Sequence, residues 1–109
     1  MNSNFDALDT SYRLIRELRA PLAKLQRKDR RLWSQLRSAA SSISLNLAEG
    51  RGRSGQDRRQ FWRIAAGSAE EVRAALKVGE AFGDLGPSDL EPALESLDRL
   101  FGMLWRMTH

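Results

Sequence analysis

The stretch LWSQLRSAASSISLNL, residues 32–47, decides how this chain folds. Its apolar side chains recur every three or four residues, at Leu32, Leu36, Ala39, Ile43 and Leu47. This spacing predicts an α-helix with one apolar face. The alanines and serines of residues 38–42 are small, so we expect a neighbouring helix to approach closely.

Both ends of this helix are marked in the sequence. Asp29 is well placed to cap its first turn, because an aspartate can accept a hydrogen bond from a free backbone N–H. We expect the helix to run to about Glu49. The segment Gly50-Arg51-Gly52-Arg53 then predicts its end, since glycine readily adopts the left-handed conformation found just beyond helices.

Similar apolar stripes occur in the sequence before and after residues 32–47. Residues 4–28 predict one helix that is bent at Pro21, since an interior proline removes a backbone hydrogen bond and crowds the preceding turn. A third helix is predicted from Ser54, which forms a potential capping box with Asp57. The stripes comprise Leu8, Tyr12, Ile15, Leu18, Leu22 and Leu25 in the first segment, and Phe61, Ile64, Ala65, Val72 and Leu76 in the third.

The segment Gly83-Asp84-Leu85-Gly86-Pro87 predicts the clearest break in the chain. Ser88 and Glu91 resemble a capping box for a last helix, with Pro92 in its first turn. The apolar face of this helix comprises Leu90, Leu94, Leu97, Phe101, Leu104 and Trp105. Four helices with short connections pack most simply as an antiparallel, up-down-up-down four-helix bundle, so we expect a single all-α domain over residues 1–109.

Composition and histidine content argue against an enzyme, a cofactor or a metal centre. The chain has no cysteine, and His109, its last residue, is its one histidine. The glycines at 50, 52 and 55 are not followed by the Gly-Lys-Ser/Thr of a phosphate loop. The lack of cysteine suits a reducing compartment, and no stretch reaches the roughly 18 apolar residues of a membrane span, so we expect a cytoplasmic protein without a membrane partner.

Charge is unevenly distributed along the chain. Residues 1–63 contain 14 Lys and Arg against 6 Asp and Glu, whereas residues 64–109 contain 4 against 8. The basic side chains gather at the first two predicted connections, with Lys24 and Arg37 near the first and Arg63 near the second. We expect phosphate contacts from Arg27, Lys28, Arg30 and Arg31 at the first connection, and from Arg51, Arg53, Arg58 and Arg59 at the second.

Two interpretations of this charge remain open. The basic surface could bind nucleic acid, with Trp33 and Trp62 stacking on unpaired bases. Alternatively it could contact the acidic surface of another copy or of a partner protein, with both tryptophans in the core or in an interface. In an up-down bundle the two clusters would lie at opposite ends.

Several segments resemble a known family. These are residues 34–40 (SQLRSAA), Asn46-Leu47-Ala48-Glu49-Gly50-Arg51-Gly52-Arg53, and residues 61–68 (FWRIAAGS), together with Glu71. They are similar to the four-helix-bundle family named after proteins encoded in 23S rRNA intervening sequences, which looks related to the accessory variability determinants of diversity-generating retroelements. The resemblance implies a non-enzymatic homopentamer, and the retroelement members bind nucleic acid and a reverse transcriptase.

The resemblance also identifies motif positions. Asn46, Glu49, Gly50, Gly52 and Arg53 occupy the family's Asn-x-Ala-Glu-Gly-x-Gly-Arg motif, and Gly67 with Ser68 its Gly-Ser pair. Asn46 and Glu49 lie one turn apart near a helix end. We expect them to bond the backbone of the connection or to pair with an arginine such as Arg53, in preference to binding a ligand directly.

Overall fold

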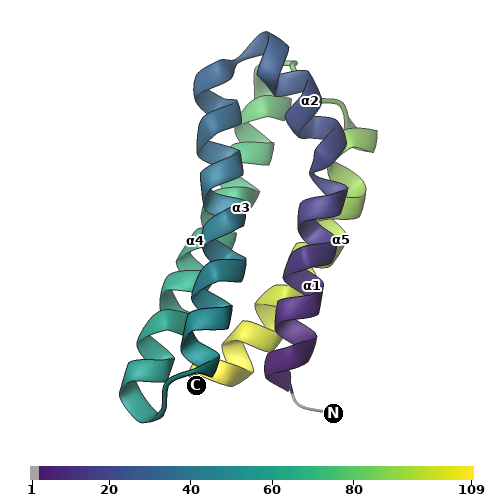
Figure 1. The fold of residues 1–109 in the computed structure, drawn as a ribbon. Coiled ribbons are helices and arrows are strands. Elements are labelled where there is room, and N and C mark those ends of the chain that lie inside the picture. Colours follow the sequence, from purple (N-terminus) through teal and green to yellow (C-terminus); the bar gives the residue numbers. More distant parts are fainter. Residues whose placement is uncertain (1–2) are drawn as a thin grey trace.

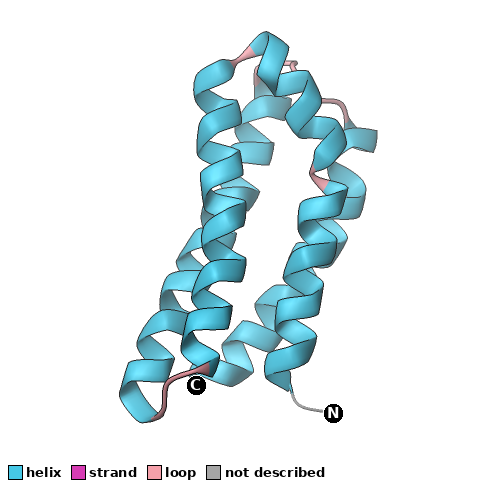
Figure 2. Ribbon diagram, viewed as in Figure 1, coloured by secondary structure: helices cyan, strands magenta, loops and turns pink. Residues whose placement is uncertain are grey.

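The protein is all-helical, as the sequence predicted. The computed structural model describes residues 3–109, with side chains from Asp6 onward. Within this range it has five helices and no strand (Figures 1 and 2). They are α1 (Ser3–Glu17), α2 (Arg19–Lys28), α3 (Arg30–Arg51), α4 (Gly55–Ala81) and α5 (Pro87–Thr108).

The first predicted helix is divided in two, which corrects the expectation of one bent helix. Leu18 separates α1 from α2, although its backbone N–H still bonds to the carbonyl oxygens of Leu14, at 2.9 Å, and Ile15, at 3.1 Å. Pro21 explains the break, because it has no N–H to donate to the carbonyl of Glu17 and its ring crowds that carbonyl. The chain therefore bends one turn before the proline.

The helices surround one elongated core. α1 packs against α3 and α5, and α4 packs against the same two helices, while α2 lies mainly on α3. The α2–α3 turn and the α4–α5 connection lie at one end of the molecule, and the α3–α4 connection lies at the other (Figure 1). The principal extents are 42 × 23 × 19 Å, so these two ends are well separated.

The predicted stripes supply most of the core. The largest fully buried side chains include Leu18, Leu25, Leu36, Ile43 and Leu76. Three predicted stripe residues are instead exposed, namely Tyr12 at 43%, Ile64 at 42% and Trp105 at 62%. They lie at the edges of their helical stripes, where a position that fits the spacing can still face outward.

The helix caps agree only in part with the sequence. Asp29 caps α3 as predicted, because its Oδ1 accepts a hydrogen bond from the backbone N–H of Leu32 at 3.0 Å. Ser54 occupies the N-cap position of α4 but forms no side-chain cap. Its expected partner Asp57 accepts instead from Arg53, so the predicted capping box is absent here.

The cap predicted for α5 is wrong. Gly86 is the N-cap, and its backbone N–H donates to Oδ2 of Asp89 at 2.8 Å. The helix starts at Pro87, earlier than predicted, so Pro92 lies inside it rather than in its first turn. Proline is favourable at the first helical position, so the helix begins at Pro87 and is not capped by Ser88.

Gly50 has a different role from the one predicted. It lies inside α3, while the C-cap Gly52 has a right-handed φ of −81°. In the described chain, positive φ values occur at Gly55 (60°) and Gly83 (81°). A Cβ on Gly50 would lie 2.5 Å from Nε1 of Trp62, so glycine is required here by the close approach of that indole. Trp62 is 6% exposed and belongs to the core.

Small hydroxyls connect the helices inside the molecule. Ser11 of α1 and Ser44 of α3 lie with their Oγ atoms 2.8 Å apart. Ser68 of α4 donates to Oγ of Ser42 on α3 at 2.7 Å, and Ser96 of α5 donates to the carboxylate of Glu17 on α1. These bonds satisfy polar groups that would otherwise be costly to bury.

Candidate nucleic-acid interface

The predicted cations lie at the two ends of the molecule. Those of the first cluster follow the end of α2 and the start of α3, and those of the second surround the α3–α4 connection (Figure 1). The two clusters are thus separate on one chain, as an up-down arrangement predicted. Their surroundings differ, and this difference determines which cations can meet a ligand.

At the α3–α4 end, Arg53 is held by two carboxylates. It contacts Oε2 of Glu49 at 3.0 Å and Oδ2 of Asp57 at 3.0 Å. Its guanidinium also lies 5.0 Å from the ring centroid of Phe61. Hydrogen bonding to Glu49, and then to Asp57, raises the pKa of Arg53 above its ordinary value. Glu49 therefore pairs with Arg53, as the sequence suggested, although its side chain is half exposed.

Arg58 is tied to the end of α3. Its Nε donates to the carbonyl oxygens of Arg53 at 2.8 Å and Gly50 at 3.2 Å, and its guanidinium lies 5.4 Å from the ring centroid of Trp62. The last carbonyls of a helix lack intrahelical donors and carry partial negative charge. Arg58 thus acts as a cationic cap for α3.

The other cations at this end differ in exposure. Arg51 is half-buried in the last turn of α3, whereas Arg59 and Arg63 are exposed on α4. Neither Arg59 nor Arg63 forms an ion pair within residues 3–109. Of the cations predicted to bind phosphate here, Arg53 and Arg58 are therefore already bonded within the chain, and Arg59 is exposed.

The α2–α3 end is different. Arg27, Lys28, Arg30 and Arg31 are all exposed, and none of them forms an ion pair with the described residues. Arg27 donates to the carbonyl of Ala23 at 3.3 Å, and Arg30 lies 5.4 Å from the ring centroid of the half-buried Trp33. None of the four predicted cations of this cluster is thus neutralised by a carboxylate of the described residues.

One lysine near this end is engaged. Nζ of Lys24 lies 2.8 Å from Oδ2 of Asp89, which also accepts from the backbone N–H of Gly86. The bond from Lys24, reinforced by that from Gly86, lowers the pKa of Asp89 below its ordinary value. The pair links α2 to the start of α5 and holds the α4–α5 connection.

A surface beside this end includes a cation that the sequence did not single out. Arg19 of α2 and Arg37 of α3 line one depression of about 470 Å³, together with Gln26 and Trp33. Arg19 lies nearly two turns before the predicted cluster, so only the packing of α2 on α3 places it near Arg37. No sequence signal that we used could have identified it.

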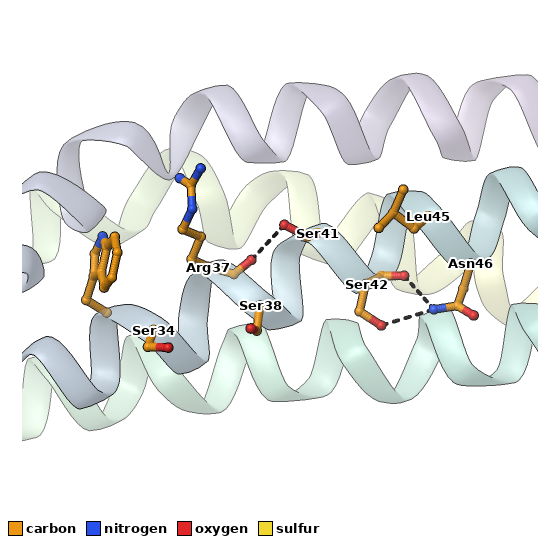
Figure 3. A pocket seen from close by; sticks show the side chains of 8 residues that line it. Ser34, Arg37, Ser38, Ser41, Ser42, Leu45 and Asn46 are labelled. Carbon is orange, nitrogen blue, oxygen red and sulfur yellow. Dashed lines mark hydrogen bonds between the residues drawn. The ribbon is translucent and has the colours of Figure 1, made fainter.

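The motif residues form a hydrogen-bonded group on α3 and α4. Asn46 donates from Nδ2 to the backbone oxygen and to Oγ of Ser42, at 2.8 and 3.0 Å, as Figure 3 shows. Oγ of Ser42 also accepts from Ser68. Asn46 thus bonds one turn back along α3 instead of pairing with an arginine. The neighbouring Gly67 has open space where a Cβ would lie.

Two further features of the described residues bear on the kind of site. In the described part of the chain, no three His, Cys, Asp or Glu side chains lie close enough together to hold a metal ion. Over the same residues, no helix has both the length and the apolar character that a bilayer crossing requires.

Comparison with known proteins identifies the family. No curated protein matches the chain. A family model described as 23S rRNA-intervening sequence protein matches residues 3–106, which is nearly the whole chain. This match confirms the resemblance drawn from the Asn46–Arg53 motif and the Gly67-Ser68 pair. The chain belongs to the family of 23S rRNA-intervening sequence proteins.

Proposed function

We propose that this protein is a non-enzymatic accessory factor that binds RNA or DNA electrostatically through its α2–α3 end. The contacts come from Arg27, Lys28, Arg30 and Arg31, with a weaker contribution from Arg59 at the opposite end. Arginine-rich surfaces suit phosphate because the guanidinium fork matches its oxygens.

A single observation supports this assignment. The four cations at the α2–α3 end are exposed and form no ion pair in the described chain, whereas Arg53 and Arg58 at the other end bond to carboxylates and carbonyls. When cations of a protein neutralise phosphates, the counterions held by the nucleic acid are released. This release is the main source of sequence-independent binding. Cations already paired gain less from a phosphate.

The proposal includes an assembly. We infer that α1 and α2 act together as one bent rod, so that five helices make an antiparallel four-helix bundle, and that five copies form a ring. The closed set of contacts among α1, α3, α4 and α5 supports the bundle. The family resemblance supports the ring. Five copies would present five α2–α3 ends to one nucleic acid, and simultaneous contacts increase affinity.

Salt titration tests the binding. Affinity for a structured RNA, measured at about 50 mM salt and above, is expected to fall with a log-log slope of roughly 0.7 to 0.9 per phosphate contacted. Replacing Lys28 and Arg31 together by Gln is expected to lower that slope by roughly 1.4 to 1.8 for each α2–α3 end that contacts the RNA. Arg99→Gln, an exposed change on α5, is the matched control. Absence of binding at about 50 mM salt would overturn the proposal.

A second function is favoured by exposed apolar side chains. Leu45, Phe82 and Trp105 are 69%, 72% and 62% exposed, as in surfaces that contact other proteins. The chain would then be an interaction module that joins subunits or docks a partner such as a reverse transcriptase. Arg30→Glu separates the two functions. Loss of nucleic acid with the assembly intact supports the first, and dissociation of the assembly supports the second.

A further inference from the structure

The surface between α2 and α3 has the properties of a binding groove. Trp33 and Arg37 line two adjoining depressions, of about 470 Å³ on the α2 side and about 420 Å³ along α3. Because they share these two lining residues, we name the two depressions together the groove, a path along both helices. It starts at Arg19 and Gln26 on α2, passes Trp33 and Arg37, and continues along the serines of α3 to Asn46.

The charge along this path is positive. Arg19 and Arg37 are exposed, neither forms an ion pair with residues 3–109, and no acidic residue lines either depression. In Figure 3 the Arg37 side chain extends from α3 towards the ribbon of α1 and α2, away from the side on which Ser34 and Ser38 lie. The groove thus has a cationic rim and a hydroxyl-lined rim.

The two rims offer different interactions. The arginines can bind backbone phosphates. Ser34 and Ser38 are exposed, and the Ser41 hydroxyl is already bonded to the carbonyl of Arg37 at 3.0 Å. A serine hydroxyl both donates and accepts, so it can bond a base edge or a sugar hydroxyl of any nucleotide. Trp33 lies where the depressions meet and supplies an aromatic surface for a base.

We propose that a single-stranded segment of nucleic acid lies along this groove, with phosphates on Arg19 and Arg37 and a base against Trp33. This rests on the proposed function and specifies its ligand. A base can lie against Trp33 in the groove only if it is unpaired and unstacked, as in a single strand. A duplex keeps its bases paired and stacked inside the helix, so it can place phosphates at the α2–α3 end but no base against Trp33.

Fluorescence anisotropy with two labelled probes tests the ligand. The probes are an unstructured 12-nucleotide oligouridine and a 12-base-pair RNA duplex, both at about 50 mM salt. Wild-type protein is expected to bind the single strand about tenfold more tightly. Arg37→Gln and Ser38→Glu should each weaken single-strand binding about five- to tenfold and change duplex binding less than twofold. Arg63→Gln, an exposed change on α4, is the control.

Tryptophan fluorescence gives a second measurement. Oligouridine should quench the emission of wild-type protein, and Trp33→Leu should remove most of this quenching, whereas Trp33→Phe should retain most of the affinity because it keeps an aromatic ring. Circular dichroism shows whether each variant is folded. Ser38→Glu adds an exposed charge on a helix surface, so it remains informative if a change at Trp33 unfolds the protein.

The possible outcomes separate the two proposals. Equal binding of both probes, with Arg37→Gln and Ser38→Glu no different from Arg63→Gln, would overturn the groove and leave the α2–α3 end as the site. Binding of neither probe would overturn the proposed function itself. A change in molar mass by light scattering for Ser38→Glu would identify this face as a contact between protein chains, which also overturns the groove.

Discussion

The two ends of this molecule have similar numbers of arginines and use them differently. At the α3–α4 end, Arg58 bonds to backbone carbonyls and Arg53 bonds to Glu49 and Asp57. At the α2–α3 end, Arg30 and Arg31 are exposed and form no ion pair with the described residues. A run of basic residues in a sequence therefore does not reveal how much of its charge is available.

The difference follows from the connections themselves. Residues 52–54 separate α3 from α4, so the last carbonyls of α3 need donors, and Arg58 in the first turn of α4 supplies them. α2 and α3 are separated only by Asp29, which caps α3 with its own carboxylate. The cations around Asp29 are not needed for capping. The α3–α4 end is thus stabilised by its arginines, whereas the arginines of the α2–α3 end are not used in this way.

The largest expected effect is on packing at the α3–α4 end. Gly50→Ala would place a Cβ 2.5 Å from Nε1 of Trp62, so we expect a loss of about 1–3 kcal/mol in the free energy of unfolding. Gly67→Ala, also within a helix but with no atom near its Cβ, should stabilise the protein by about 0.5–1 kcal/mol. Urea denaturation measures both. Equal effects of the two changes would contradict the close approach of Trp62.

The next effect concerns the cap of α3. Arg58→Gln removes donors to the carbonyls of Gly50 and Arg53, so it should lower the free energy of unfolding by about 1–2 kcal/mol. The neighbouring Arg59→Gln should change it by less than about 0.5 kcal/mol, since Arg59 is exposed. Thermal unfolding followed by circular dichroism compares them. A similar loss for both would show that charge, and not capping, is responsible.

A third prediction depends on pH. Asp89→Asn weakens the bonds to Lys24 and Gly86 and should cost about 1 kcal/mol at neutral pH. Because the pKa of Asp89 is lowered in the folded protein, its contribution is fully present above about pH 4 and is lost as pH falls through that lowered value.

Unfolding experiments between pH 7 and pH 2 should therefore show the stabilities of wild type and Asp89→Asn converging on the acidic side. Asp98→Asn is the matched control on the same helix, since Asp98 is exposed and forms no ion pair in the described range. A difference that persisted unchanged at pH 2 would show that the carboxylate charge of Asp89 has no role.

The smallest effect is on binding to nucleic acid, and it tests the comparison of the ends directly. Arg31→Gln should reduce the log-log salt slope by roughly 0.7 to 0.9, the value for one phosphate, for each α2–α3 end in contact. Arg53→Gln should leave the slope nearly unchanged, because Arg53 is already paired with Glu49 and Asp57. Filter binding at several salt concentrations distinguishes them. A larger change in slope for Arg53→Gln than for Arg31→Gln would place the interface at the α3–α4 end.

Much of the fold could be predicted from the sequence because its signals are local. The stripe from Leu32 to Leu47, the cap at Asp29 and the disturbance near Pro21 each act within a few residues. The predictions fail where contacts between residues that are distant in the sequence determine the local structure. Gly50 was read as a helix terminator, but the indole of Trp62, on another helix, determines its role.

The candidate site shows the same limit. The sequence identified the basic residues but could not show that Arg58 turns back to the carbonyls of α3, or that packing brings Arg19 beside Arg37. Likewise the Asn46 motif was visible, whereas its bond to Ser42, and that of Ser42 to Ser68, depends on how α3 meets α4. Whether a side chain is available to bind a ligand depends on the tertiary structure.

The buried hydroxyl pairs fix the axial register of the helices. A leucine stripe tolerates sliding of one helix along another by about one turn, 5.4 Å, because the next leucine can occupy the vacated place. Sliding would break the hydrogen bonds between Ser11 and Ser44 and between Ser42 and Ser68, which join α3 to α1 and to α4 inside the molecule. The positions of α1 and α4 along α3, and with them the separation of the two charged ends, are therefore set by a few small serines.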